Sequence, residues 1–218
     1  ILLWVSLMQA KRWLELFSLF IVLPLLFLAG VKQFGPYLLV LLAGVGGVCL
    51  WLLVSDQTFK RVRLWNWQEG KPHLKASLRL FLPWALATAA IVYFWLPESF
   101  LQWPAEQTSL WLLTLLLYPL FSVIPQEIIY RTFFFHRYKA ILPTHSLRLG
   151  ASTFLFGFAH AIYGNWLAVA LSAVGGAMFG MRYLQSRSTA VVVIEHSLWG
   201  CFLFTIGLGS YLSLQHTV

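Results

Sequence analysis

The sequence predicts an all-α, polytopic membrane protein: a bundle of about seven transmembrane helices with a cytoplasmic N-terminus. The 218-residue chain is 60% hydrophobic, only 10% of its residues are charged, and its mean hydropathy is +0.77. Soluble domains usually carry about 25% charged residues, so lipid must be the solvent for this much apolar surface. Because each span needs about 20 residues, we expect residues 1–218 to form a single integral-membrane domain.

Apolar runs between charged or turn-forming breaks predict the individual helices. They are Trp13–Val31, Phe34–Val54, Leu78–Leu96, Ser109–Tyr138, Leu147–Tyr163, Trp166–Leu184 and Thr189–Leu208. The fourth run is too long for a straight span, and Pro119 and Pro125 within it predict a kink or a break. A break at Pro125 would place Glu127 in the first turn of a new helix, where free backbone N–H groups favour an ionised carboxylate.

The distribution of basic residues predicts the orientation. With these runs as spans, 13 of the 15 Lys and Arg residues fall on one side of the membrane, and the other side receives only Lys32. The positive-inside rule therefore places the N-terminus in the cytoplasm and the C-terminus outside. The net charge of +8 is then a topology signal, and we expect no nucleic-acid partner. The compact chain suggests a bacterial cytoplasmic membrane, and its oligomeric state is left open.

Four ionisable residues lie deep within the predicted spans: Glu127, Arg131, His160 and His196. Such groups are costly in a membrane and usually mark function. Counted from the cytoplasmic helix ends, Glu127, His160 and His196 lie about 15, 18 and 13 Å deep, near the middle of a core about 30 Å thick. Independent structural histidines have no reason to share one depth, so we predict a single site. A buried polar cluster that fixes helix register is the alternative interpretation.

Three short motifs then suggest a family. Gln126–Arg131 resembles the pattern Glu-Glu-x-x-x-Arg, Phe156–His160 matches Phe-x-x-x-His, and His196–Gly200 resembles His-x-x-x-Asn. In this order, over residues 108–210, they resemble the CAAX-protease and bacteriocin-processing family of glutamic-type intramembrane endopeptidases. The resemblance implies a helical membrane bundle that hydrolyses a peptide bond in or near the bilayer. Its partner would be a membrane-associated or membrane-anchored protein or peptide, processed at a C-terminal or leader segment.

The resemblance also implies residue roles. In the family, the carboxylate and the first histidine activate a water, and the third-motif His and Asn stabilise the oxyanion, which are roles consistent with general-base and oxyanion chemistry. The catalytic residues expected on this basis are Glu127, His160 and His196, and the supporting or oxyanion residues are Gln126, Arg131 and Glu195.

The chain departs from the family pattern at two positions, with Gln126 in place of the first glutamate and Gly200 in place of the closing asparagine. Glu127 and Arg131 can pair on one helix face, whereas Gln126 points about 100° away and cannot act as a base. Three explanations are open: Glu127 is the base and Gln126 an amide donor to the oxyanion, the protein is inactive, or the glutamine is an engineered inactivating change. We favour the first because both histidines persist.

Two other classes of function compete with this interpretation. Two imidazoles and a carboxylate also suit zinc, so Glu127, His160 and His196 form the alternative ligand set of a zinc-dependent membrane protease, although the chain has no His-Glu-x-x-His helix. In the favoured interpretation we expect no cofactor. A catalytically inactive membrane binding or transport protein is the other alternative, but the inverted repeats that would support it are not found.

Overall fold

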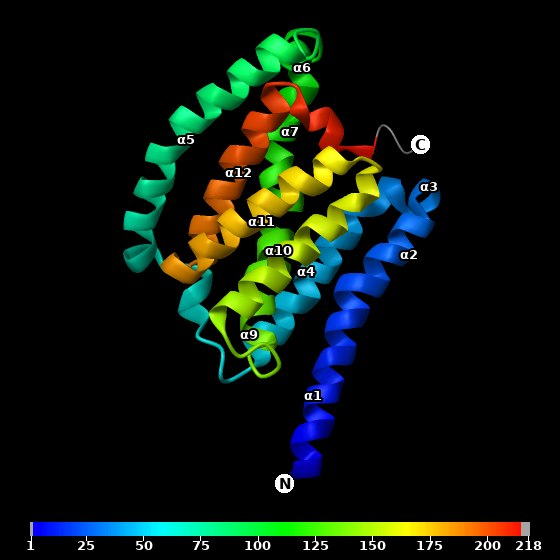
Figure 1. Ribbon diagram of the computed structural model, residues 1–218, viewed down its shortest axis with the longest axis vertical. Coiled ribbons are helices and arrows are strands. Elements are labelled where there is room, and N and C mark those ends of the chain that lie inside the picture. Colours follow the sequence, from blue (N-terminus) through cyan, green and yellow to red (C-terminus); the bar gives the residue numbers. More distant parts are fainter. Residues whose placement is uncertain (1, 215–218) are drawn as a thin grey trace.

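The computed structural model describes residues 2–214, with side chains from residue 7 onward. Within this part of the chain every regular element is helical (Figure 1). The stretches long and apolar enough to cross a membrane are Leu7–Ala29, Val31–Ser55, Arg61–Trp95, Thr108–Arg137 and Trp166–Ser186, and a shorter apolar helix covers Thr189–Thr205. The predicted all-α, polytopic membrane fold is therefore confirmed.

The elements follow the predicted runs with finer subdivision. The α-helices are α1 (Leu2–Phe17), α2 (Leu23–Ala29), α3 (Val31–Phe34), α4 (Leu38–Ser55), α5 (Trp67–Trp95), α6 (Gln102–Glu106), α7 (Thr108–Tyr118), α8 (Ile124–Glu127), α9 (Phe134–Arg137), α10 (His145–Ala159), α11 (Trp166–Ser186) and α12 (Thr189–Thr205). The π-helical segments are η1 (Ser18–Val22), η4 (Pro119–Val123) and η5 (Ile128–Phe133), and the 3₁₀ segments are η2 (Gly35–Tyr37), η3 (Arg61–Leu64), η6 (His160–Tyr163) and η7 (Leu208–Leu212).

The stretch Thr108–Arg137, which runs from α7 to α9 and is called the central helix below, does not break at Pro125. Of the predicted kink or break, the structure excludes the break. The backbone stays helical through Val123 (φ −67°, ψ −50°) and Glu127 (φ −69°, ψ −32°). The π-helical segment η4 lies directly before Ile124 and Pro125, and its wider turn accommodates a proline that lacks an N–H and would clash with an ordinary α turn. Glu127 therefore lies within a continuous helix, and its partners are side chains.

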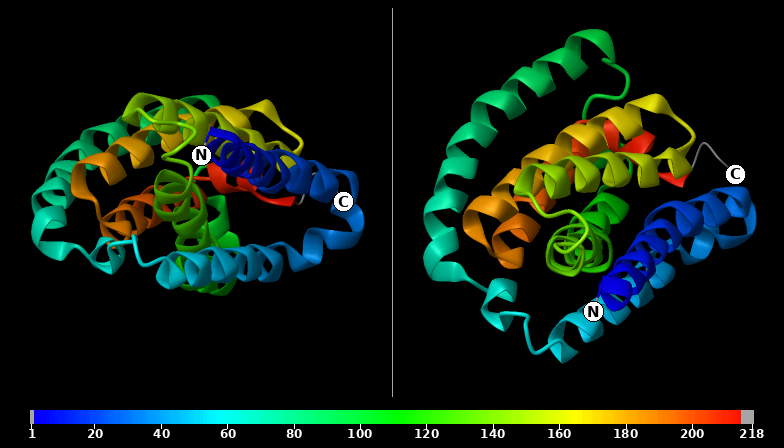
Figure 2. Two further views of the ribbon diagram at one scale, coloured as in Figure 1. Left: turned by 90° about the horizontal axis from the view of Figure 1, so that it is seen from below. Right: turned by 60° about the horizontal axis from the view of Figure 1, so that its bottom comes forward.

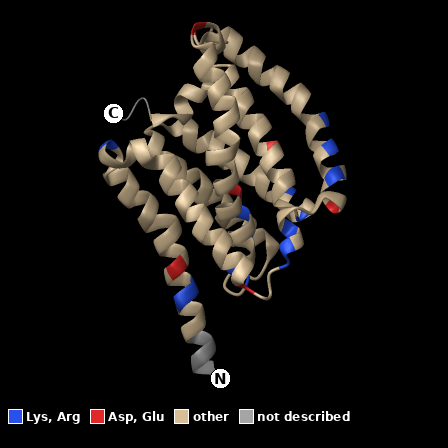
Figure 3. Cartoon of the chain, turned by 180° about the vertical axis from the view of Figure 1, so that it is seen from behind, with Lys and Arg blue, Asp and Glu red and all other residues tan. Residues whose placement is uncertain are grey.

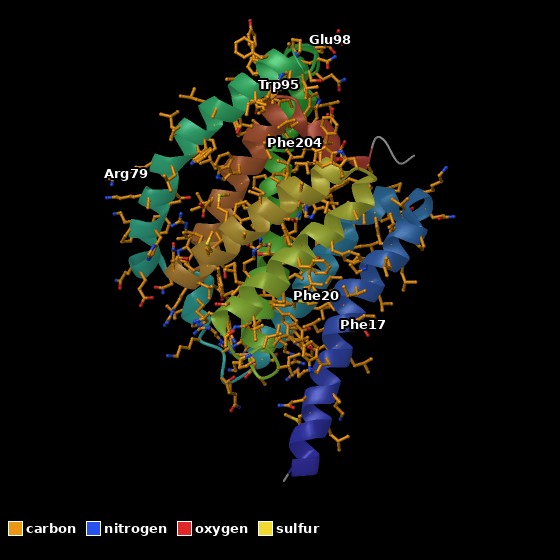
Figure 4. All side chains as sticks on the ribbon, in the orientation of Figure 1. Phe17, Phe20, Arg79, Trp95, Glu98 and Phe204 are labelled. Atoms are coloured by element: carbon orange, nitrogen blue, oxygen red, sulfur yellow. The ribbon has the colours of Figure 1, made fainter. Side chains whose placement is uncertain are left out.

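The N-terminal helices pack on the central helix. Phe20 is buried, and its ring contacts the edges of Tyr130 and Phe134 at 5.3 and 5.2 Å between centroids. Phe17, at the end of α1, is 56% exposed, as expected for a lipid-facing side chain (Figure 4). On α4, a Cβ atom added to Gly46 would lie 2.9 Å from Cβ of Pro125, so glycine allows this helix to approach the central helix closely.

Helices α10 and α11 form an antiparallel hairpin beside the central helix (Figure 1). The predicted span Leu147–Tyr163 is here a 15-residue α-helix followed by the 3₁₀ turn η6, and Gly164 (φ +71°) reverses the chain. At 1.5 Å per residue α10 is about 22 Å long, shorter than a full bilayer core. The tight turn that ends the helix begins at His160, so it sets the depth of that histidine.

Helix α5 runs along the outside of α11 and α12 (Figures 1 and 2). It begins at Trp67, well before the predicted Leu78, and Arg79 projects from it away from the bundle (Figure 4). A hydrogen bond from Ser77 to Glu195 and an edge contact between Phe81 and Trp199, 4.8 Å between centroids, attach it to α12.

Basic residues gather toward the end of the bundle at which α1 begins and on the adjoining part of α5 (Figure 3). This is the asymmetry on which the predicted orientation depends. We refer to this end of the bundle as the basal end.

Candidate active site

The carboxylate of Glu127 is fully buried between two partners. Its Oε1 accepts a hydrogen bond from Nδ1 of His196 at 2.7 Å, and its Oε2 lies 3.2 Å from Nε of Arg131. The predicted pairing of Glu127 with Arg131 is therefore confirmed, and the fourth and seventh predicted spans meet as expected. Because Nδ1 of His196 donates to the carboxylate, Nε2 is the nitrogen that faces outward, 3.1 Å from the hydroxyl of Tyr118.

Aromatic rings enclose the Arg131 guanidinium, which is also fully buried. Its central carbon lies 4.2 Å from the ring centroid of Phe156 and 5.5 Å from that of Phe179. Its charge is balanced by Glu127 and by these ring faces, so it acts as the fixed counter-charge of the buried carboxylate.

Replacing Arg131 with Met is expected to destabilise the fold by about 3–5 kcal/mol, because the buried Glu127 carboxylate loses its cation. Thermal unfolding in detergent micelles measures the effect. The double variant Arg131→Met/Glu127→Leu should recover much of the loss, since it removes both charges. If the double variant is less stable than the single one, the ion pair does not explain the cost.

His160 is held by its own helix. Its Nδ1 donates to the carbonyl of Phe156 at 2.7 Å, and its ring packs against those of Phe156 and Tyr163, 4.6 and 5.7 Å between centroids. A neutral ring that donates from Nδ1 carries its lone pair on Nε2. His160 is therefore fixed in the tautomer that a general base requires.

Two cavities meet at the site. One, of about 200 Å³, lies among α2, α4 and the central helix and is called the α2–α4 cavity. The other, of about 420 Å³, is lined largely by α11 and α12 and is called the α11–α12 cavity. Four side chains line both: Ser122, Gln126, His160 and Tyr163. These four, called the polar partition below, separate an apolar chamber from one that also contains His196.

Gln126, and not Glu127, faces these cavities. The amide Nε2 of Gln126 donates to Oγ of Ser122 at 2.7 Å, and its Oε1 is buried with no hydrogen-bond partner among the described residues. Glu127 lines neither cavity, because adjacent helical residues point about 100° apart. That Glu127 itself takes a proton from the water stays a prediction, and the contact that the structure gives its carboxylate on the cavity side is the one to His196.

Tyr118 occupies the space left by the second departure from the family pattern. A Cβ atom added to Gly200 would overlap the ring and hydroxyl of Tyr118. The hydroxyl lies 3.1 Å from Nε2 of His196 and the ring lines the α11–α12 cavity. Where the family pattern has an asparagine, this chain therefore has a phenol hydroxyl beside the same histidine.

Glu195 lies outside both cavities. Its carboxylate accepts hydrogen bonds from Arg182, at 2.9 Å from Nε, and from Ser77, so it connects α12 to α11 and α5. Among the described residues, no group of three or more His, Cys, Asp or Glu side chains is arranged to hold a metal ion. The alternative zinc set of Glu127, His160 and His196 does not form such a group.

Three of the residues that line the site were not among the predicted site residues: Tyr118, Ser122 and Tyr163. Helix spacing could have found two of them. Ser122 precedes Gln126 by one turn and Tyr163 follows His160 by one turn, so each lies on the same face as a predicted site residue. No sequence pattern places Tyr118 in the site, because its position depends on the absence of a side chain at Gly200.

Residues 108–202 match the family model described as Type II CAAX prenyl endopeptidase Rce1-like. This segment is similar to the Rce1-like family. It contains the central helix, α10, α11 and most of α12, and hence all three motifs, so the resemblance inferred over residues 108–210 is confirmed. The Rce1-like assignment supports an integral membrane protease of the CAAX type. No curated protein and no solved structure matches the chain.

Proposed function

We propose that the chain is an intramembrane endopeptidase that hydrolyses a peptide bond of a membrane-anchored substrate at the polar partition. The observation that carries this proposal is the position of Gln126 and His160 at the junction of an apolar cavity and a more polar one. A substrate with an apolar anchor and a peptide segment fits such a junction, because each part has its own chamber.

In the proposed reaction His160 is the general base. A water bound at the partition donates one hydrogen bond to Nε2 of His160 and another to the unpartnered Oε1 of Gln126. As the water oxygen attacks the scissile carbonyl carbon, its proton passes to His160. The same proton then moves to the departing amine as the C–N bond breaks, so the imidazole returns to its neutral form.

The oxyanion that forms on the carbonyl oxygen needs hydrogen-bond donors. We assign this role to the Tyr118 hydroxyl, which lies 3.1 Å from Nε2 of His196. Glu127 is then a positioning residue, because it fixes the ring of His196 through Nδ1 at 2.7 Å. Arg131 in turn fixes Glu127.

Changing Tyr118 to Phe removes the hydroxyl and keeps the ring that fills the space beside Gly200. We expect kcat to fall by about 10²-fold with little change in KM, since an oxyanion donor acts chiefly in the transition state. Steady-state cleavage of a reconstituted sample gives both constants. A KM increase with unchanged kcat would instead identify Tyr118 as a substrate-binding residue.

The α2–α4 cavity is proposed to hold the apolar anchor of the substrate. It is lined almost entirely by aliphatic and aromatic side chains, including Leu23, Phe27 and Val45. The prenyl group named in the description of the matching family is of this chemical class, as is a fatty acyl chain. The N-terminal helices would therefore contribute to substrate binding, although the family match begins after them.

Val45→Trp tests the anchor site, because the larger ring would fill much of the α2–α4 cavity. We expect KM for a peptide with a long apolar anchor to rise about tenfold or more, with a small effect on a short, unanchored analogue. Val48→Trp is the matched control, since Val48 lies on the same helix, lines neither cavity and is 57% exposed. Equal effects of both changes would show that the cavity does not hold the anchor.

The proposed activity is tested directly with purified protein in lipid nanodiscs, prenylated C-terminal peptides and leader peptides with an apolar segment. Mass spectrometry of the products should reveal cleavage of at least one class, and cleavage should persist in excess chelator. Loss of cleavage in chelator, restored by zinc, would favour the zinc-dependent alternative. Failure to cut either class would favour the inactive binding protein.

A further inference from the structure

A third cavity, of about 310 Å³, opens at the basal end of the bundle and is called the basal cavity. Five lysine and arginine side chains line it: Lys60, Arg63, Lys139, Arg148 and Arg187. These residues come from four separate segments of the chain, before α5, after α9, in α10 and after α11. The tertiary fold therefore brings them to one place.

Carboxylates do not balance this charge. The cavity lining includes His136 and His145 but no Asp or Glu. One lining residue, His136, contacts an acidic residue: its Nε2 lies 2.9 Å from Oδ2 of Asp56. The hydrogen bonds from His136 and Thr58 hold the pKa of Asp56 well below its ordinary value, so it is ionised and offsets one positive charge. Most of the cationic charge faces the cavity without a counter-ion.

Arg148 distinguishes the cavity from a merely basic surface, because this arginine is buried in the fold. Its side chain is 7% exposed, and one terminal nitrogen donates to the carbonyls of Leu142 and Pro143 at 2.5 and 3.1 Å. Its Nε is buried with no hydrogen-bond partner among the described residues. A buried guanidinium nitrogen without an acceptor is costly, and an anion in the cavity it lines would supply one.

We propose that the basal cavity binds a phosphate group, presented by the headgroup of an anionic phospholipid or by a soluble phosphate compound. A phosphate has several acceptor oxygens, and arginine forks match it geometrically. The cavity lies at the ends of the helices on the side that the charge distribution predicts to face the cytoplasm, which is the level of anionic headgroups. It is separate from the polar partition and shares none of its residues.

Binding is tested on the full chain in neutral detergent, by thermal shift and native mass spectrometry. The probes are phosphatidylglycerol, phosphatidylcholine and inorganic phosphate at matched ionic strength. The double variant Lys139→Gln/Arg187→Gln removes two exposed cations from the lining, so folding is preserved. Lys71→Gln/Lys75→Gln is the matched control, since these exposed lysines of the same predicted face do not line the cavity.

We expect saturable binding of phosphatidylglycerol, of inorganic phosphate or of both. The affinity of the Lys139→Gln/Arg187→Gln variant should be about 25-fold weaker, or about fivefold per cation. The control variant should stay within about twofold of the unchanged protein. Binding of inorganic phosphate alone assigns a soluble source, and binding of the lipid alone assigns the headgroup. The proposal is overturned if both variants weaken equally, if phosphatidylcholine binds as tightly, or if no probe saturates.

Discussion

Replacing His160 with Ala is expected to lower kcat/KM for peptide cleavage by about 10³-fold, because the reaction loses its general base. His160 is the imidazole of the polar partition, and its hydrogen bond to the carbonyl of Phe156 leaves Nε2 to accept a proton. Initial rates in nanodiscs at several substrate concentrations measure the change. Added imidazole should restore part of the lost activity, since the vacated space opens onto both cavities.

His73→Ala serves as the control, because this histidine of α5 lines neither cavity at the partition. Glu127→Ala and His196→Ala should also cause large losses, but imidazole should not rescue Glu127→Ala, since Glu127 acts through His196 at 2.7 Å. If the His160→Ala variant keeps its activity, another residue is the general base. Unfolding of the variant would be visible as a lowered thermal midpoint and would be distinguished in this way from a chemical effect.

Gln126→Glu is expected to raise kcat by about 10²-fold, because it places a carboxylate where the family pattern has one. In the structure the Gln126 side chain lines both cavities, next to His160, and its Oε1 is unpartnered among the described residues. A glutamate there could take the proton of the attacking water with His160. The unaltered chain would then be a slow enzyme that depends on the histidine alone.

Gln126→Met is the matched control for shape, because it keeps the length of the side chain and removes both polar atoms. It should lower kcat below that of the unchanged protein, since the water loses an acceptor. If Gln126→Glu lowers activity while Gln126→Met has no effect, position 126 does not contact the water, and a role for Glu127 as the base would be favoured.

The membrane fold was predictable because its signal is spread over the whole chain. Apolar runs predicted the spans, and the shared depth of Glu127 and His196 predicted that they lie close together, as they do. The path of the central helix was not predictable from Pro125 alone. A proline normally breaks an α turn, but the π-helical segment before it allows the helix to continue, and nothing in the local sequence specifies that wider turn.

The arrangement within the site was predicted less completely. Helical spacing separated Gln126 from Glu127 and paired Glu127 with Arg131, yet it could not show which of the first two faces a cavity. That choice depends on how α4 and α10 pack against the central helix. The place of Tyr118 in the site was not predicted for a related reason. Its side chain fills the space beside Gly200 from a different helix, and only the tertiary structure brings those two positions together.

The most direct test of the proposed chemistry is single-turnover cleavage in ¹⁸O-labelled water, with purified protein in nanodiscs and excess chelator. Hydrolysis at the polar partition predicts that the new C-terminal carboxylate carries the label from the solvent. It also predicts that the double variant Gln126→Met/His160→Ala forms no labelled product on the same timescale. Labelled product formed at an unchanged rate by that variant would contradict the proposed mechanism, because the water would then be activated elsewhere.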